Sequence, residues 1–542
     1  MKKTHFKLLT RSLEADVDPQ LIFEACERIS NKDYRILLES SEPGTNGCQQ
    51  SMLLLGQALK IEARAFQVTI TALNNNGQAA LAIITANLPG TLVVKASESE
   101  LLLQYPDNRL LEEESERVKR VTPLDAIRQV LSILSMDDHD DAEKLIVAGV
   151  AGYDLVDSLE VLPAVDFAEG DFPDFIFLLS DSQIHIDQRS NRVEIRQIIF
   201  SGPNEQYQTG KARGTINAIE SIVAANNSVS GQDLNNHLSA TQSVDAVEVY
   251  PAATEFMSEV VKIQQAIAKG QVFQTVISRN FSLDCNNPLL AYQFLKLQNP
   301  SPYQFYLRLG DYTLFGASPE SSLRYQHRQR TIAIMPIAGT RGRGRTASGA
   351  INDELDARLE ADLKLDQKEL AEHLMLVDLA RNDLARIAET GSRKVKELMA
   401  VYRYSAVMHM VSRIEATLSS DLDIYHACQS CFHMGTLTGA PKKEAMKLIR
   451  ETEQRRRGAY GGAVGYFTAA GDMDTAIIIR SALVKNAQAT ITAGAGIVAD
   501  STPENELLET ELKAAAVIKA VQLAENYHKF ELLEEASDVA SV

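Results

Sequence analysis

Several features are scarce in this sequence, and each scarcity excludes a class of protein. Only five of the 542 residues are cysteines, which is too few and too scattered for a disulfide framework: Cys26, Cys48, Cys285, Cys428 and Cys431. No apolar run of about 18 residues lacks a charge or a turn former, so no membrane-spanning helix is predicted. Lys7, Arg11 and Glu14 interrupt any apolar stretch that a signal peptide would need. We therefore expect reduced thiols and a cytoplasmic location.

Basic residues are outnumbered by acidic ones. The chain has 54 Lys and Arg against 72 Asp and Glu, which gives a formal net charge of −18. Such a charge repels phosphate backbones, so nucleic acid is not the expected partner. With 45% hydrophobic and 23% charged residues the composition is that of a folded globular protein, which excludes disorder over the whole chain.

The hydrophobic pattern predicts strands in antiparallel groups separated by helices. Apolar and polar residues alternate on both sides of turn residues in 65–83 and again in 174–200, which favours two hairpins. Residues 254–268 and 366–387 have apolar residues at helical spacing. Because strands and helices do not alternate strictly, we predict an α+β fold.

An Asn-, Ser-, Gln- and Gly-rich stretch between about residues 225 and 250 lacks periodicity and predicts a domain boundary. We place an N-terminal domain at 1–235, a linker at 236–250, a second domain at 251–525 and an acidic tail at 526–542.

Two predicted helices each carry a pair of glutamates three residues apart. The pairs are Glu369 with Glu372 and Glu506 with Glu509. This spacing puts both carboxylates of a pair on one helix face. Four carboxylates from two converging helices would suit Mg²⁺, which prefers oxygen ligands. Each pair alone has another explanation, since glutamates near a helix start are favoured by the helix dipole.

Other candidate residues have a functional and a structural interpretation. Gly494 and Gly496 follow a strand-like run, where backbone N–H groups could bind an anion or where the chain could simply turn. Arg480 lies in an apolar run and needs either an anionic ligand or an internal salt bridge. His409 has apolar neighbours, which is more typical of a core histidine. The Cys428-x-x-Cys431 pair is expected to be two core thiols in a helix rather than a zinc site.

Taken together, the motifs resemble those of chorismate-utilising enzymes. FGASPES, PIAGTR, KELAEHLMLVDLARNDL, YSAVMHMVSR, MGTLTGAPK, GAYGGAVGYF, IIIRSALV and AGAGIVADSTPENELLET occur in the order found in that family. In the N-terminal half, ILLES and AGYDLVDSLEVLP are similar to segments of the large-subunit family of bacterial anthranilate synthases. The resemblance implies antiparallel sheets packed as a sandwich with helices outside, a regulatory N-terminal domain and a chorismate-binding second domain.

The resemblance also implies a binding site. Mg²⁺ would be bound by Glu372 and Glu509, with Glu369 and Glu506 acting through water. The enolpyruvyl carboxylate of chorismate would be held by Arg480, Tyr460 and the backbone of Gly494, Ala495 and Gly496. The ring would be lined by Gly339, Thr340 and Thr436.

The chemistry implied by the resemblance has two steps. Ammonia adds at C2 while the C4 hydroxyl leaves with a proton from Glu320, and pyruvate is then eliminated with help from His409. Gln274 and Ala338 stand where sister enzymes use lysines, so anthranilate is the expected product and tryptophan biosynthesis the expected pathway. The alternatives are an aminodeoxyisochorismate or aminodeoxychorismate synthase, or a catalytically silent amino-acid-binding paralogue.

Two further partners follow from the resemblance. L-Tryptophan would bind as a feedback inhibitor at a site matching Glu39, Ser40, Pro302, Tyr303 and Gln304. Gln304 replaces a usual Met, Gln50 a possible Lys and Ala476 a possible Cys. No glutaminase arrangement is visible in the sequence, so a separate glutamine amidotransferase subunit would supply ammonia, with a hetero-tetramer as the expected assembly.

Overall fold

The structure is a computed structural model. It describes residues 5–41, 49–111, 113–135, 141–168, 170–229, 234, 247–346, 349–404 and 407–540, with side chains up to residue 527. Within these ranges, no helix is both long enough and apolar enough to cross a membrane.

The strands pair antiparallel throughout and form one sheet that branches at its longest pair, β3 (Gln50–Arg64) with β8 (Phe175–Asp187). The first arm leaves β3 and runs through β2 (Tyr34–Ser40), β12 (Tyr303–Leu309), β13 (Tyr312–Ser318), β22 (Ser481–Lys485), β23 (Gln488–Ile497) and β11 (Gln274–Asp284), which also pairs with β10 (Glu248–Tyr250) and β19 (Gly439–Ala440).

The second arm leaves β8. It runs through β7 (Ile146–Ala151), β20 (Ala463–Thr468), β21 (Met473–Ile477), β14 (Ser321–Gln326), β15 (Thr331–Ile334) and β18 (Val407–Thr417), which also pairs with β16 (Ile337–Gly342) and β17 (Lys394–Arg403). The remaining strands extend the N-terminal part: β1 (Phe6–Glu14), β4 (Gln67–Ala72), β5 (Val93–Ala96), β6 (Glu100–Gln104) and β9 (Arg192–Phe200).

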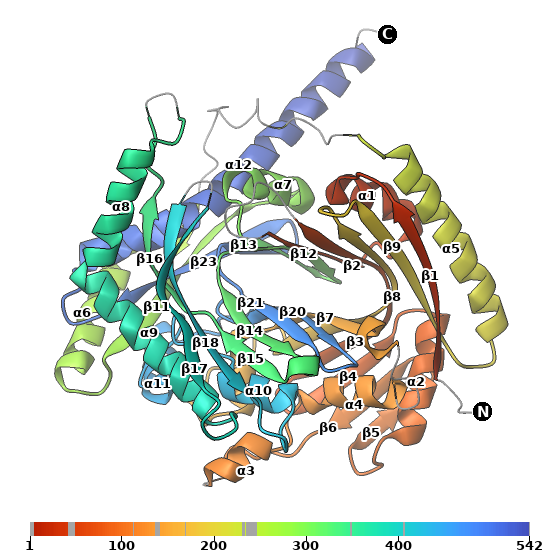
Figure 1. The fold of residues 1–542 in the computed structure, drawn as a ribbon, viewed down its shortest axis with the longest axis horizontal. Coiled ribbons are helices and arrows are strands. Elements are labelled where there is room, and N and C mark those ends of the chain that lie inside the picture. The colour runs from red at the N-terminus through yellow and green to blue at the C-terminus, as the bar shows by residue number, and fades with distance from the viewer. Residues whose placement is uncertain are drawn as a thin grey trace.

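Helices cover the outside of the two arms (Figure 1). They are α1 (Pro19–Ala25), α2 (Asn75–Asn87), α3 (Glu114–Lys119), α4 (Asp125–Leu134), α5 (Glu205–Ala225), α6 (Ala253–Ala268), α7 (Pro288–Gln298), α8 (Asp353–Leu365), α9 (Gln367–Ala385), α10 (Ile424–Cys431), α11 (Lys442–Glu453) and α12 (Pro503–Ala540). The predicted α+β class is confirmed. The backbone of residues 526–540, predicted as a separate tail, continues α12.

The two predicted domains share strand pairings. β2 of the N-terminal half pairs with β12, and β7 pairs with β20, so each arm begins in the first half of the chain and continues in the second. Most of the predicted linker, residues 236–246, lies outside the described residues. The proposed division at 235 and 251 therefore stays a prediction.

The prediction of a hairpin at residues 65–83 is wrong. Only β4 forms there, and the following residues fold as α2. Asn74 is the N-cap of this helix, and its side-chain oxygen accepts a hydrogen bond from the Gly77 N–H at 2.8 Å. A Cβ at Gly77 would lie 1.9 Å from the Ala58 carbonyl oxygen, so only glycine fits. An Asn/Gly cluster is typical of helix starts as well as of hairpin turns, and here it forms the start of α2.

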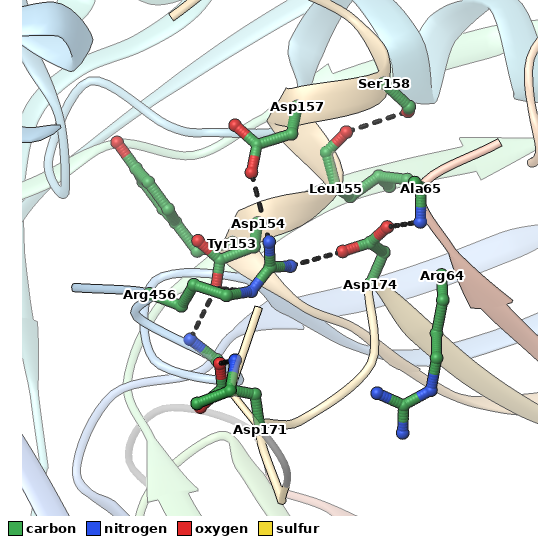
Figure 2. A network of polar contacts seen from close by, with 12 residues as sticks. Arg64, Ala65, Tyr153, Asp154, Leu155, Asp157, Ser158, Asp171, Asp174 and Arg456 are labelled. Atoms are coloured by element: carbon green, nitrogen blue, oxygen red, sulfur yellow. Dashed lines mark hydrogen bonds and ion pairs between the residues drawn. The ribbon is translucent and has the colours of Figure 1, made fainter. Parts of the chain in front are cut away.

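A buried group of charges, which we call the ionic joint, links the two halves: Asp154, Asp157, Asp174, Arg450 and Arg456. Figure 2 shows Arg456 reaching Asp174 at 2.5 Å and Asp157 at 3.3 Å. Arg450 pairs with Asp154 at 3.1 Å. Asp154 also accepts a hydrogen bond from the Gly458 N–H at 2.7 Å. The joint thereby fixes the backbone two residues before Tyr460.

Candidate active site

Two helices bring four glutamates together, as their spacing predicts. We call Glu369 and Glu372 of α9, with Glu506 and Glu509 of α12, the carboxylate cluster. Burial, together with the negative charges of the other three glutamates, raises the pKa of Glu372 to about 7, with the Lys368 ammonium acting in the opposite direction. The four carboxylates are therefore near enough to repel one another.

Cationic side chains neutralise part of this cluster. Lys513 pairs with Glu509 at 2.6 Å, Arg341 with Glu369 at 2.9 Å, and Lys368 with Glu372 at 3.7 Å. The Oε2 atom of Glu506 is buried and has no hydrogen-bond partner. No group of three or more acidic, histidine or cysteine side chains among the described residues is arranged as a ready-made metal site. Oxygen ligands with one unpartnered oxygen nevertheless fit a hard divalent cation.

Glu320 is enclosed between β13 and β14. Only 4% of the residue is exposed, and burial raises the pKa of its carboxyl to about 8, with Thr436, the Ile337 backbone and Lys513 acting in the opposite direction. Its Oε1 atom and the Thr436 hydroxyl are both buried without a hydrogen-bond partner. At neutral pH this carboxyl carries its proton, as a general acid must.

His409 lies on β18 and faces Thr340 of β16 across the sheet. The Thr340 hydroxyl is 2.8 Å from the imidazole Nδ1. Burial, together with the positive charge of Arg480, lowers the pKa of His409 to about 4, with the Gly339 backbone acting in the opposite direction. The imidazole is half-buried rather than a core side chain, and it is neutral at physiological pH, the state in which it can accept a proton.

Gly339 lies on β16 next to Thr340 and also borders the carboxylate cluster. Its φ of +88° lies in the region that favours glycine, at an irregularity in the β16–β18 pairing. A Cβ there would lie 3.0 Å from Leu363 Cδ1 and 3.3 Å from Glu369 Oε2. Because glycine has no side chain, the backbone of β16 can approach the Glu369 carboxylate closely.

Arg480 does not lie in a strand, contrary to the apolar run that contains it. β21 ends at Ile477, and Arg480 adopts a φ of +52° before β22 begins. Its Nη1 donates to the Lys513 carbonyl of α12 at 2.7 Å. No carboxylate of the described residues forms an ion pair with it, so the alternative of an internal salt bridge is wrong. A strained arginine without an anionic partner is typical of a binding site.

Gly494 and Gly496 lie inside β23 rather than in a turn. A Cβ at Gly494 would come within 2.6 Å of the Tyr460 hydroxyl, and one at Gly496 within 2.6 Å of Gln274 Nε2. Both residues lie beyond the part of β23 that pairs with β22. The Gly494 carbonyl accepts from Lys513 Nζ at 2.9 Å, on the side away from β11.

In an antiparallel pair, the backbone N–H groups of successive residues point alternately toward the partner strand and away from it. The N–H groups of Gly494, Ala495 and Gly496, which the resemblance assigns to the substrate carboxylate, therefore do not all point to the same side. The N–H groups of Gly494 and Gly496 point to the open edge of β23, while the backbone of Ala495 faces Ile277 of β11. The glycines, but not Ala495, therefore present backbone donors to a ligand. The side chain of Gln274 ends nearby in a buried Oε1 atom without a partner.

All five predicted effector residues line one cavity of about 660 Å³, which we call the effector cavity. Gln50 and Ala476 line it as well. The β2–β12 register places Ser40 opposite Tyr303 and Glu39 opposite Gln304. The Glu39 carboxylate accepts from the Tyr292 hydroxyl at 2.5 Å and pairs with Lys296 at 2.7 Å, so α7 already neutralises its charge.

The sequence reasoning missed the cations of the carboxylate cluster. Lys368 stands four residues before Glu372, and Lys513 four residues after Glu509, the spacing at which helical side chains of opposite charge meet. This signal was present in the sequence. Arg341 had no comparable signal, because its pairing with Glu369 depends on how β16 packs on α9.

Comparison with known proteins identifies the family of this chain. The family model of chorismate binding enzymes matches residues 87–519, and the chain belongs to that family. Within it, the chain is 43% identical over 527 residues to anthranilate synthase component 1 of Escherichia coli (strain K12), covering 96% of this chain and 98% of that protein.

Two solved structures have the same fold. Anthranilate synthase component I of Streptococcus pneumoniae superposes with a TM-score of 0.62 at 26% identity, over 88% of this chain and 94% of that one. The menaquinone-specific isochorismate synthase of Escherichia coli superposes with a TM-score of 0.65 at 17% identity, over 95% of this chain and 94% of that one. The second likeness concerns the fold alone.

Proposed function

We propose that the chain is the large subunit of an anthranilate synthase, which converts chorismate and ammonia to anthranilate, pyruvate and water in tryptophan biosynthesis. The observation that carries the proposal is geometric: the Glu320 carboxyl is buried with its Oε1 atom unpartnered, and the His409 imidazole lies 2.8 Å from the Thr340 hydroxyl. Burial raises the pKa of Glu320 and lowers that of His409, which supports a proton donor and a proton acceptor, as a sequence of leaving-group protonation and C2 deprotonation requires. The relatives at about 40% identity are named for the same activity.

In this proposal each residue has one task. Glu320 gives its proton to the departing C4 hydroxyl, and His409 takes the C2 proton as pyruvate leaves. Arg480, Tyr460 and the N–H groups of Gly494 and Gly496 hold the enolpyruvyl carboxylate. Gly339, Thr340 and Thr436 line the ring, and the unpartnered Thr436 hydroxyl is available for a substrate oxygen.

The carboxylate cluster would hold Mg²⁺. Glu372 and Glu509 are the proposed direct ligands, with Glu369 and Glu506 acting through water. The bound cation would supply charge neutralisation for the substrate carboxylate next to the reacting carbons. Lys368 and Lys513, whose side chains are 59% and 40% exposed, have room to turn away from the cluster into solvent.

Two partners complete the proposal. A separate glutamine amidotransferase subunit would supply ammonia in the cytoplasm, as a hetero-tetramer with this chain. L-Tryptophan would bind in the cavity lined by the ends of the paired strands β2 and β12, on Glu39, Ser40, Pro302, Tyr303 and Gln304, and inhibit the reaction.

The test uses the purified chain with chorismate, MgCl₂ and an ammonium salt, without a partner. Anthranilate fluorescence and pyruvate release are followed together, and equal amounts of both are expected. Chorismate loss without pyruvate would indicate an enzyme that releases the aminated intermediate. No chorismate loss would favour the silent binding protein.

A further inference from the structure

We propose that Tyr404 is a positioning residue for His409 and is at the same time part of the wall of the effector cavity. An occupant of the cavity then acts on the histidine through a single aromatic side chain. The inference rests on the proposed function, because it assigns a control point to the same reaction.

Tyr404 lies where β17 turns into β18. Its backbone N–H donates to the Val407 carbonyl at 2.8 Å, which anchors the residue at the start of β18. The centre of its ring lies 5.6 Å from that of His409, and the two planes are inclined by 59°. The imidazole is therefore held by the Thr340 hydroxyl at one edge and by the Tyr404 ring beside it.

The same tyrosine lines the effector cavity. The cavity extends from the β2–β12 wall to Ile337, Tyr402, Tyr404 and Val411. The strand register places Tyr402 opposite His409 and Ile337 opposite Val411. Residues directly opposite one another, or two apart on one strand, share a face of the sheet. His409 thus points to the face of β18 that borders the cavity.

Glu320 has a matching connection to the cavity. Its neighbours Pro319 and Ser321 line the cavity. The backbone of Ile337, another lining residue, acts against the rise in the pKa of the Glu320 carboxyl. Glu320 thus lies between two cavity-lining residues in the sequence, and His409 contacts the cavity-lining Tyr404.

The expected consequence concerns turnover rather than substrate affinity. Tyr404 contacts His409, and none of its described hydrogen bonds, ion pairs or ring contacts involves the carboxylate cluster or Arg480. Misplacing a catalytic group by about 1 Å lowers a rate by about 100-fold while the substrate still binds. Loss of the Tyr404 ring should accordingly lower kcat and leave the KM for chorismate nearly unchanged.

The experiment compares Tyr404→Leu with Tyr404→Phe in the purified chain, with Mg²⁺ and ammonium. We expect kcat to fall by about 10- to 100-fold in Y404L, with KM for chorismate within about threefold, and Y404F to restore most of the rate. Tyr312→Leu is the matched control. It removes a similar edge contact, to Phe172 at 5.1 Å, from a residue that does not line the cavity, and it should retain kcat.

The second readout is inhibition by L-tryptophan at saturation. Tryptophan should lower kcat of the unaltered chain and of Y404F, and calorimetry should detect its binding to Y404L while its effect on kcat is reduced at least about fivefold. Unchanged kcat in Y404L, or full inhibition of Y404L by tryptophan, would overturn the inference. If the unaltered chain makes no anthranilate, it is the proposed function that fails.

Discussion

The ionic joint and the carboxylate cluster are both groups of buried or half-buried charges, and they differ in their counter-ions. In the joint, the arginine side chains are 3% and 8% exposed and sit among three aspartates. In the cluster, four carboxylates share cations whose side chains are 28% to 59% exposed. The joint's cations cannot leave without stranding buried charge, whereas those of the cluster can turn into water.

This difference separates a structural charge group from a functional one. A fixed ion pair holds two segments in register, and nothing else is needed to neutralise it. A carboxylate group with displaceable lysines and an unpartnered oxygen, Glu506 Oε2, is prepared to exchange one cation for another. Changes in the site should therefore affect rate and ligand affinity, and changes in the joint should affect stability.

The largest effect is expected for Glu320→Gln, which belongs to the site. The amide cannot give a proton to the C4 hydroxyl, so kcat should fall by about 10²- to 10⁴-fold. Anthranilate fluorescence measures the rate, and thermal unfolding measures stability. Because the carboxyl is protonated when buried, the amide should not lower the unfolding temperature. A destabilised E320Q would assign Glu320 to the structural class instead.

Asp154→Asn in the joint should show the reverse. The Asp154 side chain is 1% exposed. Replacing its carboxylate by an amide removes one of the two carboxylate partners of Arg450 and leaves only Asp157. Breaking a buried pair costs about 3–5 kcal/mol, which denaturant unfolding would detect. Asp157→Asn is the control, because that side chain is 30% exposed and should cost less than half as much. Equal losses would show that burial does not govern the joint.

The pH profile tests the site without a substitution. Glu320 must be protonated to act, so kcat/KM should fall about tenfold per pH unit above about pH 8. His409 must be neutral, so with Mg²⁺ at saturation, which keeps the Glu372 carboxylate ionised against its own pKa of about 7, the acid limb should appear only near pH 4. Ammonium is adjusted at each pH to keep the concentration of free ammonia constant. A profile that stays flat to pH 9.5 would contradict the assignment of Glu320 as the acid.

The smallest effect is expected for Lys368→Met. This change removes the ammonium group 3.7 Å from Glu372, which would otherwise compete with Mg²⁺. We expect Mg²⁺ to bind a few-fold more tightly at pH 8, measured by titration calorimetry, since an exposed pair contributes about 1 kcal/mol or less. Lys364→Met removes a similar pair with Glu360 on α8 and should leave Mg²⁺ affinity unchanged. Weaker binding in K368M would mean that the lysine does not compete.

The sequence predicted those features that depend on local spacing. The glutamate pairs follow from helical periodicity, and the α+β class follows from the grouping of strands. Residues 65–83 do not form the predicted hairpin, because Asn74 and Gly77 suit a turn and a helix start equally. The position of Arg480 outside the strand depends on where β21 ends and β22 begins, and the approach of Tyr404 to His409 depends on how β17 pairs with β18. Such long-range register leaves no local trace in the sequence.

The pairings β2–β12 and β7–β20 also bear on synthesis. Each joins a strand of the first half of the chain to one of the second, so during translation β2 and β7 each present an edge whose partner strand has not yet been made. Open strand edges recruit other chains, and non-local pairing is slow. The nascent protein should therefore depend on chaperones until residues 303–309 and 463–468 have emerged. A fragment ending near residue 235 should aggregate rather than fold.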